Sequence, residues 1–288
     1  MKRVLLVLCL FAAMVTPLFS AGTTDSYEGR IGANATIEVK SDIPSIRIVT
    51  NSSENRVTAR LEGASSDRFI FTARESRDGF SVEVKRKRSL GVDLFTMLPA
   101  ELVITIPRGA TLGDLEISAV SGSVTIEDDL HVREIGIGTV SGAISVPTLS
   151  AERKVTFESV SGAIRGDVVT APSITIGSVS GKIDIRELVA PAGQVSVETV
   201  SGSTSIGSLH APISEIQTVS GSTTITLPAS FAGTVETASV SGSIQVTFPR
   251  TQQVQSDRQR TYYQLGTGND YSKVSTISGR VTISQQSR

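Results

Sequence analysis

The chain has 288 residues, a formal net charge of -1 and one cysteine. This charge gives no electrostatic reason to expect a nucleic acid or an anionic membrane as partner. Trp is absent, Tyr and Phe number only 4 and 9, and Val, Ile, Ser, Thr and Gly abound, which is typical of many short β-strands joined by tight turns.

Residues 1–21 have the order of a secretory signal peptide. Met1-Lys2-Arg3 precedes an apolar run from Val4 to Val15, and small residues follow at 20–22. The run is shorter than the ~20 apolar residues that a membrane-spanning helix needs. We therefore expect an exported protein in the periplasm, on the outer surface or outside the cell. Cleavage would remove Cys9 and leave no cysteine for a disulfide.

Residues 22–110 contain short alternating runs without a repeated motif. These predicted strands cover 35–40, 46–49, 56–61, 69–71, 80–84 and 102–107. We expect this region to form a β-strand cap, continuous with the repeat region 111–288 as one domain. Such a cap would cover the first repeat, which would otherwise expose an unpaired strand edge.

A basic run, Lys85 to Arg88, leads into the mainly apolar segment 89–99. Such a segment could place residues 85–98 on an anionic membrane surface. The favoured interpretation is that the charges lie at a solvated strand end and that the apolar segment folds back over the core.

Val-Ser-Gly recurs along the second part of the chain. The glycines are spaced by 20, 20, 19, 21, 19 and 21 residues, and a variant, Ile277-Ser278-Gly279, follows after 37. The Ser-Gly pairs are Ser121 and Gly122, Ser141 and Gly142, Ser161 and Gly162, Ser180 and Gly181, Ser201 and Gly202, Ser220 and Gly221, Ser241 and Gly242, and Ser278 and Gly279. We interpret them as structural turns, with glycine supplying φ > 0 and serine bonding a nearby backbone group or the next repeat.

Apolar residues recur at fixed distances from each turn. They lie five and three positions before the motif valine and four and six after it, so both arms have the period of a strand with one buried face. Examples are Leu115 and Ile117, Ile135 and Ile137, Val155 and Phe157, Ile174 and Ile176, Val195 and Val197 before the turn, and Val124 and Ile126, Ile144 and Val146, Ile183 and Ile185, Ile244 and Val246, Val281 and Ile283 after it. A third apolar position falls at Leu130, Leu149, Val168, Leu188 and Leu209.

Two folds fit this pattern: antiparallel hairpins, or a coil whose strands stack in parallel on their equivalents. Hairpins would call for Asn-Gly or Asp-Gly turns. Equivalent side chains at near-constant spacing instead favour stacking at ~4.8 Å, which aligns like residues in continuous columns. We predict an all-β protein: a parallel β-solenoid with rungs of about 20 residues, Val-Ser-Gly turns and an N-terminal β cap.

The interval between the last two motifs holds Tyr262, Tyr263 and Tyr271. We predict an elaborated rung or surface loop between residues 250 and 273. Clustered tyrosines can form a recognition surface for sugars or proteins, so these three are candidate ligand contacts.

The sequence shows no pattern of an active site. His131 and His210 have no nearby His or Cys companion, so we expect no metal and no cofactor. Glu158 and Glu198 occupy equivalent positions two rungs apart, ~10 Å on this stacking, at the upper end of the spacing in inverting glycosidases. Without a closer acidic partner, we interpret them as part of a solvated face and expect no enzyme.

The Val-Ser-Gly series, the lead-in 104–110 and the closing segment 266–283 resemble the bacterial putative-adhesin β-strand-repeat domains, a group of unknown function. The resemblance implies a non-catalytic, adhesin-like module of the cell envelope or surface, with an unknown protein or glycan as ligand. Two alternatives remain open: a structural or stress-associated envelope component that binds other proteins, and a polysaccharide-processing β-helix enzyme.

Overall fold

The computed structural model describes residues 25–286, apart from 31, 33, 43, 52–55, 64–67, 77–78, 88–99, 111, 249–251 and 257–258. The predicted signal peptide therefore lies outside the described residues. The described elements are all strands, and they include no helix that could span a membrane.

The strands are β1 (Asp25–Arg30), β2 (Thr36–Ser41), β3 (Ser45–Asn51), β4 (Arg56–Glu62), β5 (Phe69–Ser76), β6 (Gly79–Arg86), β7 (Glu101–Pro107), β8 (Leu112–Ala119), β9 (Val124–Ile126), β10 (Leu130–Thr139), β11 (Ile144–Ser159), β12 (Ile164–Thr170), β13 (Ser173–Ser178), β14 (Ile183–Val189), β15 (Gln194–Thr199), β16 (Thr204–His210), β17 (Ile213–Thr218), β18 (Ser222–Leu227), β19 (Gly233–Ser239), β20 (Ser243–Thr247), β21 (Gln252–Ser256), β22 (Arg260–Leu265), β23 (Asp270–Thr276) and β24 (Arg280–Gln285).

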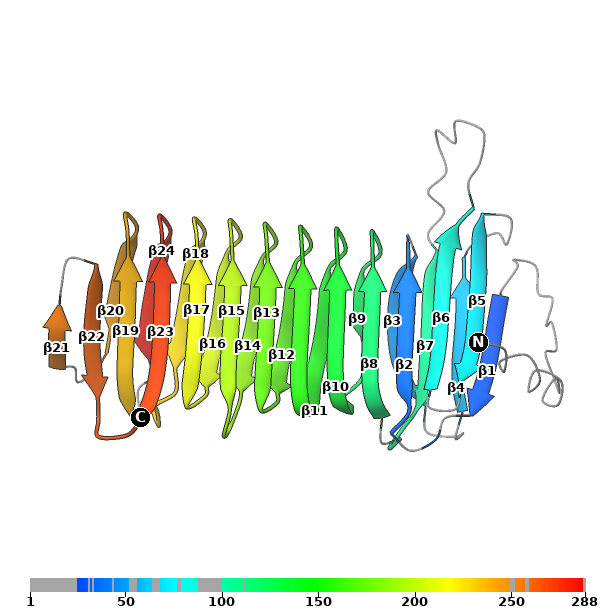
Figure 1. Cartoon of the computed structure of the whole chain (residues 1–288), viewed down its shortest axis with the longest axis horizontal. Helices are drawn as coiled ribbons and strands as arrows, with labels where there is room; N and C mark the ends of the chain where they lie inside the picture. The colour runs from blue at the N-terminus through cyan, green and yellow to red at the C-terminus, as the bar shows by residue number, and fades with distance from the viewer. Residues whose placement is uncertain are drawn as a thin grey trace, which may run out of the picture.

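These strands wind into an elongated coil whose equivalent segments stack in parallel (Figure 1). In each rung one strand enters the motif turn on what we call the front face, and the next leaves it on the back face. Ile137 of β10, for example, lies beside Ile117 of β8 and Phe157 of β11, in parallel register on both sides. The predicted parallel β-solenoid is confirmed.

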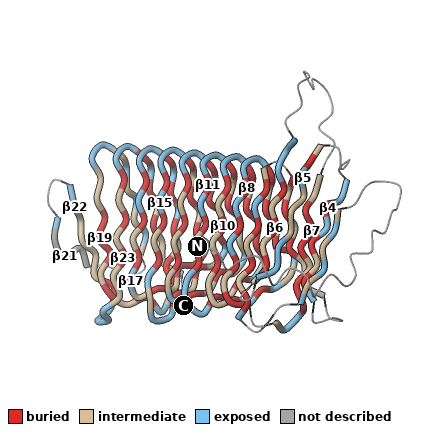
Figure 2. The backbone as a smooth tube through the Cα atoms, turned by 45° about the vertical axis from the view of Figure 1, so that its right-hand side comes forward, coloured by how far each residue is buried: buried red, intermediate tan, exposed pale blue. Residues whose placement is uncertain are grey.

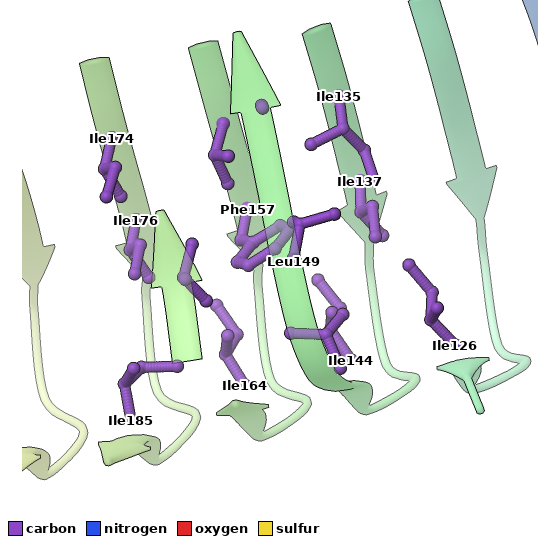
Figure 3. Close-up of a cluster of buried hydrophobic side chains, with 14 of the residues drawn as sticks. Ile126, Ile135, Ile137, Ile144, Leu149, Phe157, Ile164, Ile174, Ile176 and Ile185 are labelled. Carbon is purple, nitrogen blue, oxygen red and sulfur yellow. The ribbon is translucent and has the colours of Figure 1, made fainter. Parts of the chain in front are cut away.

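Matching aliphatic side chains form the columns of the core between the two faces (Figure 3). The two front-face positions predicted before each turn are buried throughout, and Phe157 is among the largest fully buried side chains. The third apolar position needs one correction. Val169, not Val168, pairs with Leu149 and Leu188 and is 0% exposed. Two successive residues that are not buried, Pro147 and Thr148, separate Val146 from Leu149, so the alternation changes phase there.

Two rungs lack the Val-Ser-Gly motif. Strands β6 and β7, inside the predicted cap region, form the outermost rung and stack in parallel on β2 and β3. Residues 36–51, in the same region, form the next rung, in which β2 and β3 stack in parallel on β8 and β9. Here Asp42 occupies the place of the motif valine, because its carbonyl accepts the N–H of Ser121 (3.1 Å). Ser41 Oγ donates to Pro44 O (2.8 Å), as Thr139 Oγ1 does to Gly142 O (2.7 Å).

Antiparallel strands cover the ends of the coil. At the N-terminal end, β4 and β1 extend the sheet beyond β7, and β5 pairs with β6. At the C-terminal end, β22 and β21 cover β19 on the front face. On the back face, β20 pairs on one side with β24, and no other described strand pairs with it. Consequently Ile244 and Val246 stay partly exposed, although equivalent residues in other rungs are buried.

The last two rungs are exchanged relative to their order in the sequence. Strand β23 pairs with β17 on one side and β19 on the other, and β24 lies between β18 and β20. The final segment of the chain, red in Figure 1, is therefore inserted between rungs formed by residues 213–227 and 233–247. The long interval before Gly279 supplies the chain for this return, through the hairpin of β21 and β22.

A pair of engineered cysteines can test the inserted rung. Thr224 and Thr282 are direct partners on adjacent strands, whereas Gln245 lies one strand further away. Adjacent strands are ~4.8 Å apart, within the Cα range of a disulfide, and ~9.5 Å is beyond it. In a background lacking Cys9, Thr224→Cys with Thr282→Cys should cross-link on oxidation, seen as faster migration in a non-reducing gel. Cross-linking of Thr224→Cys with Gln245→Cys instead would contradict the exchange.

The motif glycines lie where successive turns come closest together. A Cβ added to Gly162 would lie 1.7 Å from the carbonyl oxygen of Gly142, and the other contacts of this kind, from Gly142 to Gly279, lie between 1.7 and 2.3 Å. The expectation of φ > 0 at these glycines is wrong: the described glycines with positive φ are Gly63, Gly109 and Gly266. Glycine is required because no side chain fits between stacked backbones.

Each turn is also hydrogen-bonded to the turn before it. Ser161 donates its N–H (2.9 Å) and its Oγ–H (3.1 Å) to the carbonyl of Val140, and Val160 N–H donates to Thr139 O (3.1 Å). Other motif serines repeat this arrangement. The hydroxyl residue before each valine is mostly buried and bonds within its own turn, as Ser178 does to Gly181. The turn backbone is thus satisfied from rung to rung.

A matched pair of glycine substitutions separates crowding from loss of flexibility. Gly162→Ala should destabilise the protein by about 2 kcal/mol or more, because the new methyl group overlaps the Gly142 carbonyl. Gly138→Ala places its methyl group in open space and should be neutral or stabilising by up to about 1 kcal/mol. Urea unfolding curves measure both changes. Equal effects of the two substitutions would show that crowding is not the cause.

Candidate functional site

A line of exposed aliphatic side chains follows the edge of the solenoid where the motif turns stack. The motif valines are between 39% and 70% exposed, and Val140, Val160, Val179 and Val200 are each 46% exposed. In spatial order these side chains, which we call the valine ridge, are Val120, Val140, Val160, Val179, Val200, Val219, Ile277 and Val240. Figure 2 shows this edge as a continuous exposed border.

The ridge was not predicted from the sequence, although the strand alternation places the motif valines on the outward side. Buried residues lie at odd positions before the motif valine, such as Ile135 and Ile137 before Val140, so the valine itself falls on the outward side. Large exposed aliphatic residues are common singly, but a contiguous line of them marks an interaction surface.

A groove of about 990 Å³ runs beside the ridge along the coil axis. Its floor is the outward column two residues before each ridge residue. In register this column is Lys40, Ser118, Gly138, Glu158, Gly177, Glu198, Gln217, Ser275 and Ala238. Most of its members are small, which leaves the hollow, and one wall is apolar.

Glu158 and Glu198 are exposed in this floor, on either side of Gly177. Among the described residues, no Lys, Arg or His nitrogen lies within 4.0 Å of either carboxylate. Two cations line the described part of the groove, both near its ends: Lys40 is 2.5 Å from Glu38, and Arg260 is 3.6 Å from Glu236. The middle of the groove therefore carries two uncompensated negative charges beside an apolar ridge.

The three candidate tyrosines are not brought together on one surface. Tyr262 and Tyr271 lie on the outer front face, on either side of Glu236. Tyr263 points the other way and packs against the core, with its ring edge-on to Phe248 at 5.9 Å. The segment predicted as an elaborated rung or surface loop contains an antiparallel hairpin of β21 and β22, and β22 also pairs with β19.

Glu236 is a buried carboxylate at this end of the coil, only 5% exposed. Tyr271 donates its phenol hydroxyl to Glu236 Oε2, and Arg260 Nη1 lies 3.6 Å from Oε1. Burial, together with the hydrogen bond to the carboxylate and its charge, raises the pKa of Tyr271 to about 12. The Tyr271 hydrogen bond joins two strands of the coil, β23 and β19, and the Arg260 contact joins the covering strand β22 to β19.

Tyr271→Phe should therefore weaken the C-terminal end. Loss of a hydrogen bond to a buried carboxylate costs about 1–3 kcal/mol, whereas Tyr262→Phe should change the unfolding free energy by less than about 0.5 kcal/mol. Because the folded pKa is raised, the stabilisation is present below pH ~10 and is lost as pH rises towards 12. Tyrosinate absorbance at 295 nm should lack its phase near pH 12 in Tyr271→Phe. An unchanged titration would contradict the assignment.

The other candidate residues lie apart from the groove. In the predicted membrane-contacting segment 85–98, residues 85–87 are described and exposed, and Lys85 pairs with Glu83 at 2.6 Å. Residues 88–98 lie outside the described residues. His131 and His210 are near Glu152 and Glu187, at 3.5 and 3.6 Å. No group of three or more metal-binding side chains occurs within the described part of the chain.

The stacked turns, parallel strands and end caps define a β-solenoid repeat protein. Residues 34–284 match the profile of the family described as Toastrack DUF4097, and the chain belongs to this family. The predicted membership of an adhesin-like β-strand-repeat group of unknown function is thereby confirmed.

Two solved structures share the fold. A protein named putative adhesin from Bacteroides fragilis NCTC 9343 is 14% identical, with 91% of this chain and 97% of that chain covered and a TM-score of 0.52. A protein named putative lipid binding protein from Parabacteroides distasonis ATCC 8503 is 15% identical, with 93% and 98% covered and the same TM-score of 0.52. At these identities the likeness establishes the fold alone. No curated protein matches the chain.

Proposed function

We propose that the protein is a non-catalytic, adhesin-like binding module of the cell envelope or surface, and that it contacts its ligand through the groove and the valine ridge. The observation that carries this proposal is the ridge itself: valine is half-exposed in rung after rung. A solvated turn needs no aliphatic side chain, because the N–H and C=O groups of the turn are already bonded to neighbouring rungs.

Export and an adhesin-like role are supported by the signal-like residues 1–21 and by the name of the Bacteroides fragilis relative in fold. A structural or stress-associated envelope component would use the same surface to hold another envelope protein. The enzyme alternative has less support, because Glu158 and Glu198 are both exposed on an open floor without a described side chain placed to act with them. An acid with a raised pKa in such a reaction is normally desolvated.

Site-specific photo-cross-linking in the native envelope tests the proposal. A photoreactive residue in place of Val160 should give an adduct of defined mass, whereas one in place of Asp184, which is on the back face, should not. Changing the neighbours, Val140→Thr and Val179→Thr, should reduce the Val160 adduct at least several-fold, because the ridge becomes polar without losing β-branched shape. Adducts from Asp184 alone would overturn the groove as the contact surface.

The same experiment distinguishes the two kinds of ligand and the location. Peptides foreign to this chain in a digest of the adduct indicate a protein partner, and an added mass that glycan cleavage removes indicates an adhesin for a glycan. Protease treatment of intact cells before cross-linking shows whether the module lies on the outer surface. Retention of the whole chain in the cytoplasm would contradict the proposed export.

A further inference from the structure

The charge and spacing of the groove define a class of ligand, and this step rests on the proposed function. We propose that the groove binds an extended polypeptide segment in polyproline II conformation that carries Lys or Arg at every third residue. The cations would face Glu158 and Glu198, and an adjacent apolar edge of the peptide would pack on the valine ridge.

Charge selects a cationic ligand. Glu158 and Glu198 are exposed, lack a described cation within 4.0 Å, and lie in the middle of the groove. An anionic or neutral ligand would leave both carboxylates partly desolvated and unpaired, which is unfavourable. A second copy of this chain fits poorly, because ridge-to-ridge packing would bring like-charged carboxylates towards one another.

The spacing of the rungs indicates which peptide conformation fits the groove. Two rungs separate Glu158 from Glu198, a distance of ~9.5 Å along the axis. A polyproline II helix rises ~3.1 Å per residue with three residues per turn, so equivalent side chains recur every ~9.3 Å on one edge. In a β-strand, residues on one face recur every ~6.7 Å, and residues three apart point to opposite faces.

The spacing between the floor and the ridge argues against a helix as the ligand. The floor column and the ridge are two residues apart along each strand, as Glu158 and Val160 are, which is ~6.7 Å. An α-helix with side chains is ~10–12 Å in diameter and would rest on the ridge without reaching the floor. A polyproline II chain is narrower, and it presents three separate edges.

The backbone of the turns also argues against strand addition. The ridge carbonyls, such as Val140 O and Val160 O, already accept hydrogen bonds from the serine of the next rung. The groove therefore offers a ligand side-chain contacts and few open backbone groups. Polyproline II has no internal hydrogen bonds and keeps its backbone solvated, so it loses little hydration in an open groove.

The probe is a fluorescent peptide of four Lys-Leu-Pro repeats, measured by anisotropy with the purified mature chain. The reference peptide has the same composition but places its lysines at every second residue. We expect the period-three peptide to bind at least 5-fold more tightly. Its affinity should fall as salt rises from low to physiological ionic strength, since exposed charge pairs are screened.

Two double variants locate the site. Glu158→Gln with Glu198→Gln should weaken binding of the period-three peptide about 3- to 10-fold. Glu152→Gln with Asp167→Asn changes the net charge equally at exposed positions outside the groove and should have little effect. Thermal unfolding should be unchanged in the groove variant, because neither glutamate has a described ion-pair partner to lose.

The following outcomes would contradict the proposed ligand. Equal binding of the two peptides, or equal weakening by the two double variants, would exclude period-three recognition. Binding of a cationic polysaccharide in place of the peptide, with the same dependence on Glu158 and Glu198, would replace the occupant. If no peptide binds while cross-linking from Val160 succeeds, the ligand class fails and the proposed function stands.

Discussion

The architecture depends on the close approach of one motif turn to the next. At Gly162 the backbone of one rung lies so near the Gly142 carbonyl that any side chain would overlap it. The hydrogen bonds from Ser161 and Val160 to the preceding turn hold that approach in place. This contact sets the spacing of the rungs, and the spacing in turn aligns the aliphatic columns of the core, since matching side chains can stack only if successive rungs keep the same register.

The surface follows from the same contact. The N–H and C=O groups of each turn are hydrogen-bonded to the neighbouring rungs. The outer edge of the turns therefore presents side chains and no open backbone groups to a ligand. The valine ridge is therefore an apolar surface without the unpaired backbone of an edge strand, and it does not invite indiscriminate strand pairing. Because each rung contributes one exposed residue at the same place, the repeat builds a periodic surface. Residues that depart from the repeat, such as Glu158 and Glu198, give this surface its specific charge.

The sequence predicts the repeated part of the fold well and the exceptions poorly. The regular spacing of Val-Ser-Gly predicts the parallel stacking, and the alternation in the two arms predicts the core positions. Both predictions succeed because each rung has the same local structure. The rung of β2 and β3 could not be recognised from the motif, because Ser41, Asp42 and Pro44 form its turn instead. The insertion of β24 could not be predicted, since Gly242 and Gly279 present the same turn and only long-range pairing decides their order.

In the candidate site, too, the repeated features could be predicted from the sequence and the long-range contacts could not. The outward phase of the valines was present in the sequence and could have revealed the ridge, whereas the contact between Tyr271 and Glu236 joins residues 35 positions apart on the adjacent strands β23 and β19. No local pattern announces such a contact. Tyr263 shows the converse: its neighbour Tyr262 lies on the outer surface, but strand alternation turns Tyr263 towards the core.

The exchanged C-terminal rungs also constrain the order in which the chain can fold during its synthesis. On a ribosome, residues 233–247 emerge before residues 270–285, so β20 exists before the strand that separates it from β18 in the finished coil. From β8 to β18 each new rung stacks on the one before it, so this part can assemble one repeat at a time. The last step differs, because the final segment must insert between two strands that were synthesised earlier. The native fold can therefore be completed only after β24 has been translated.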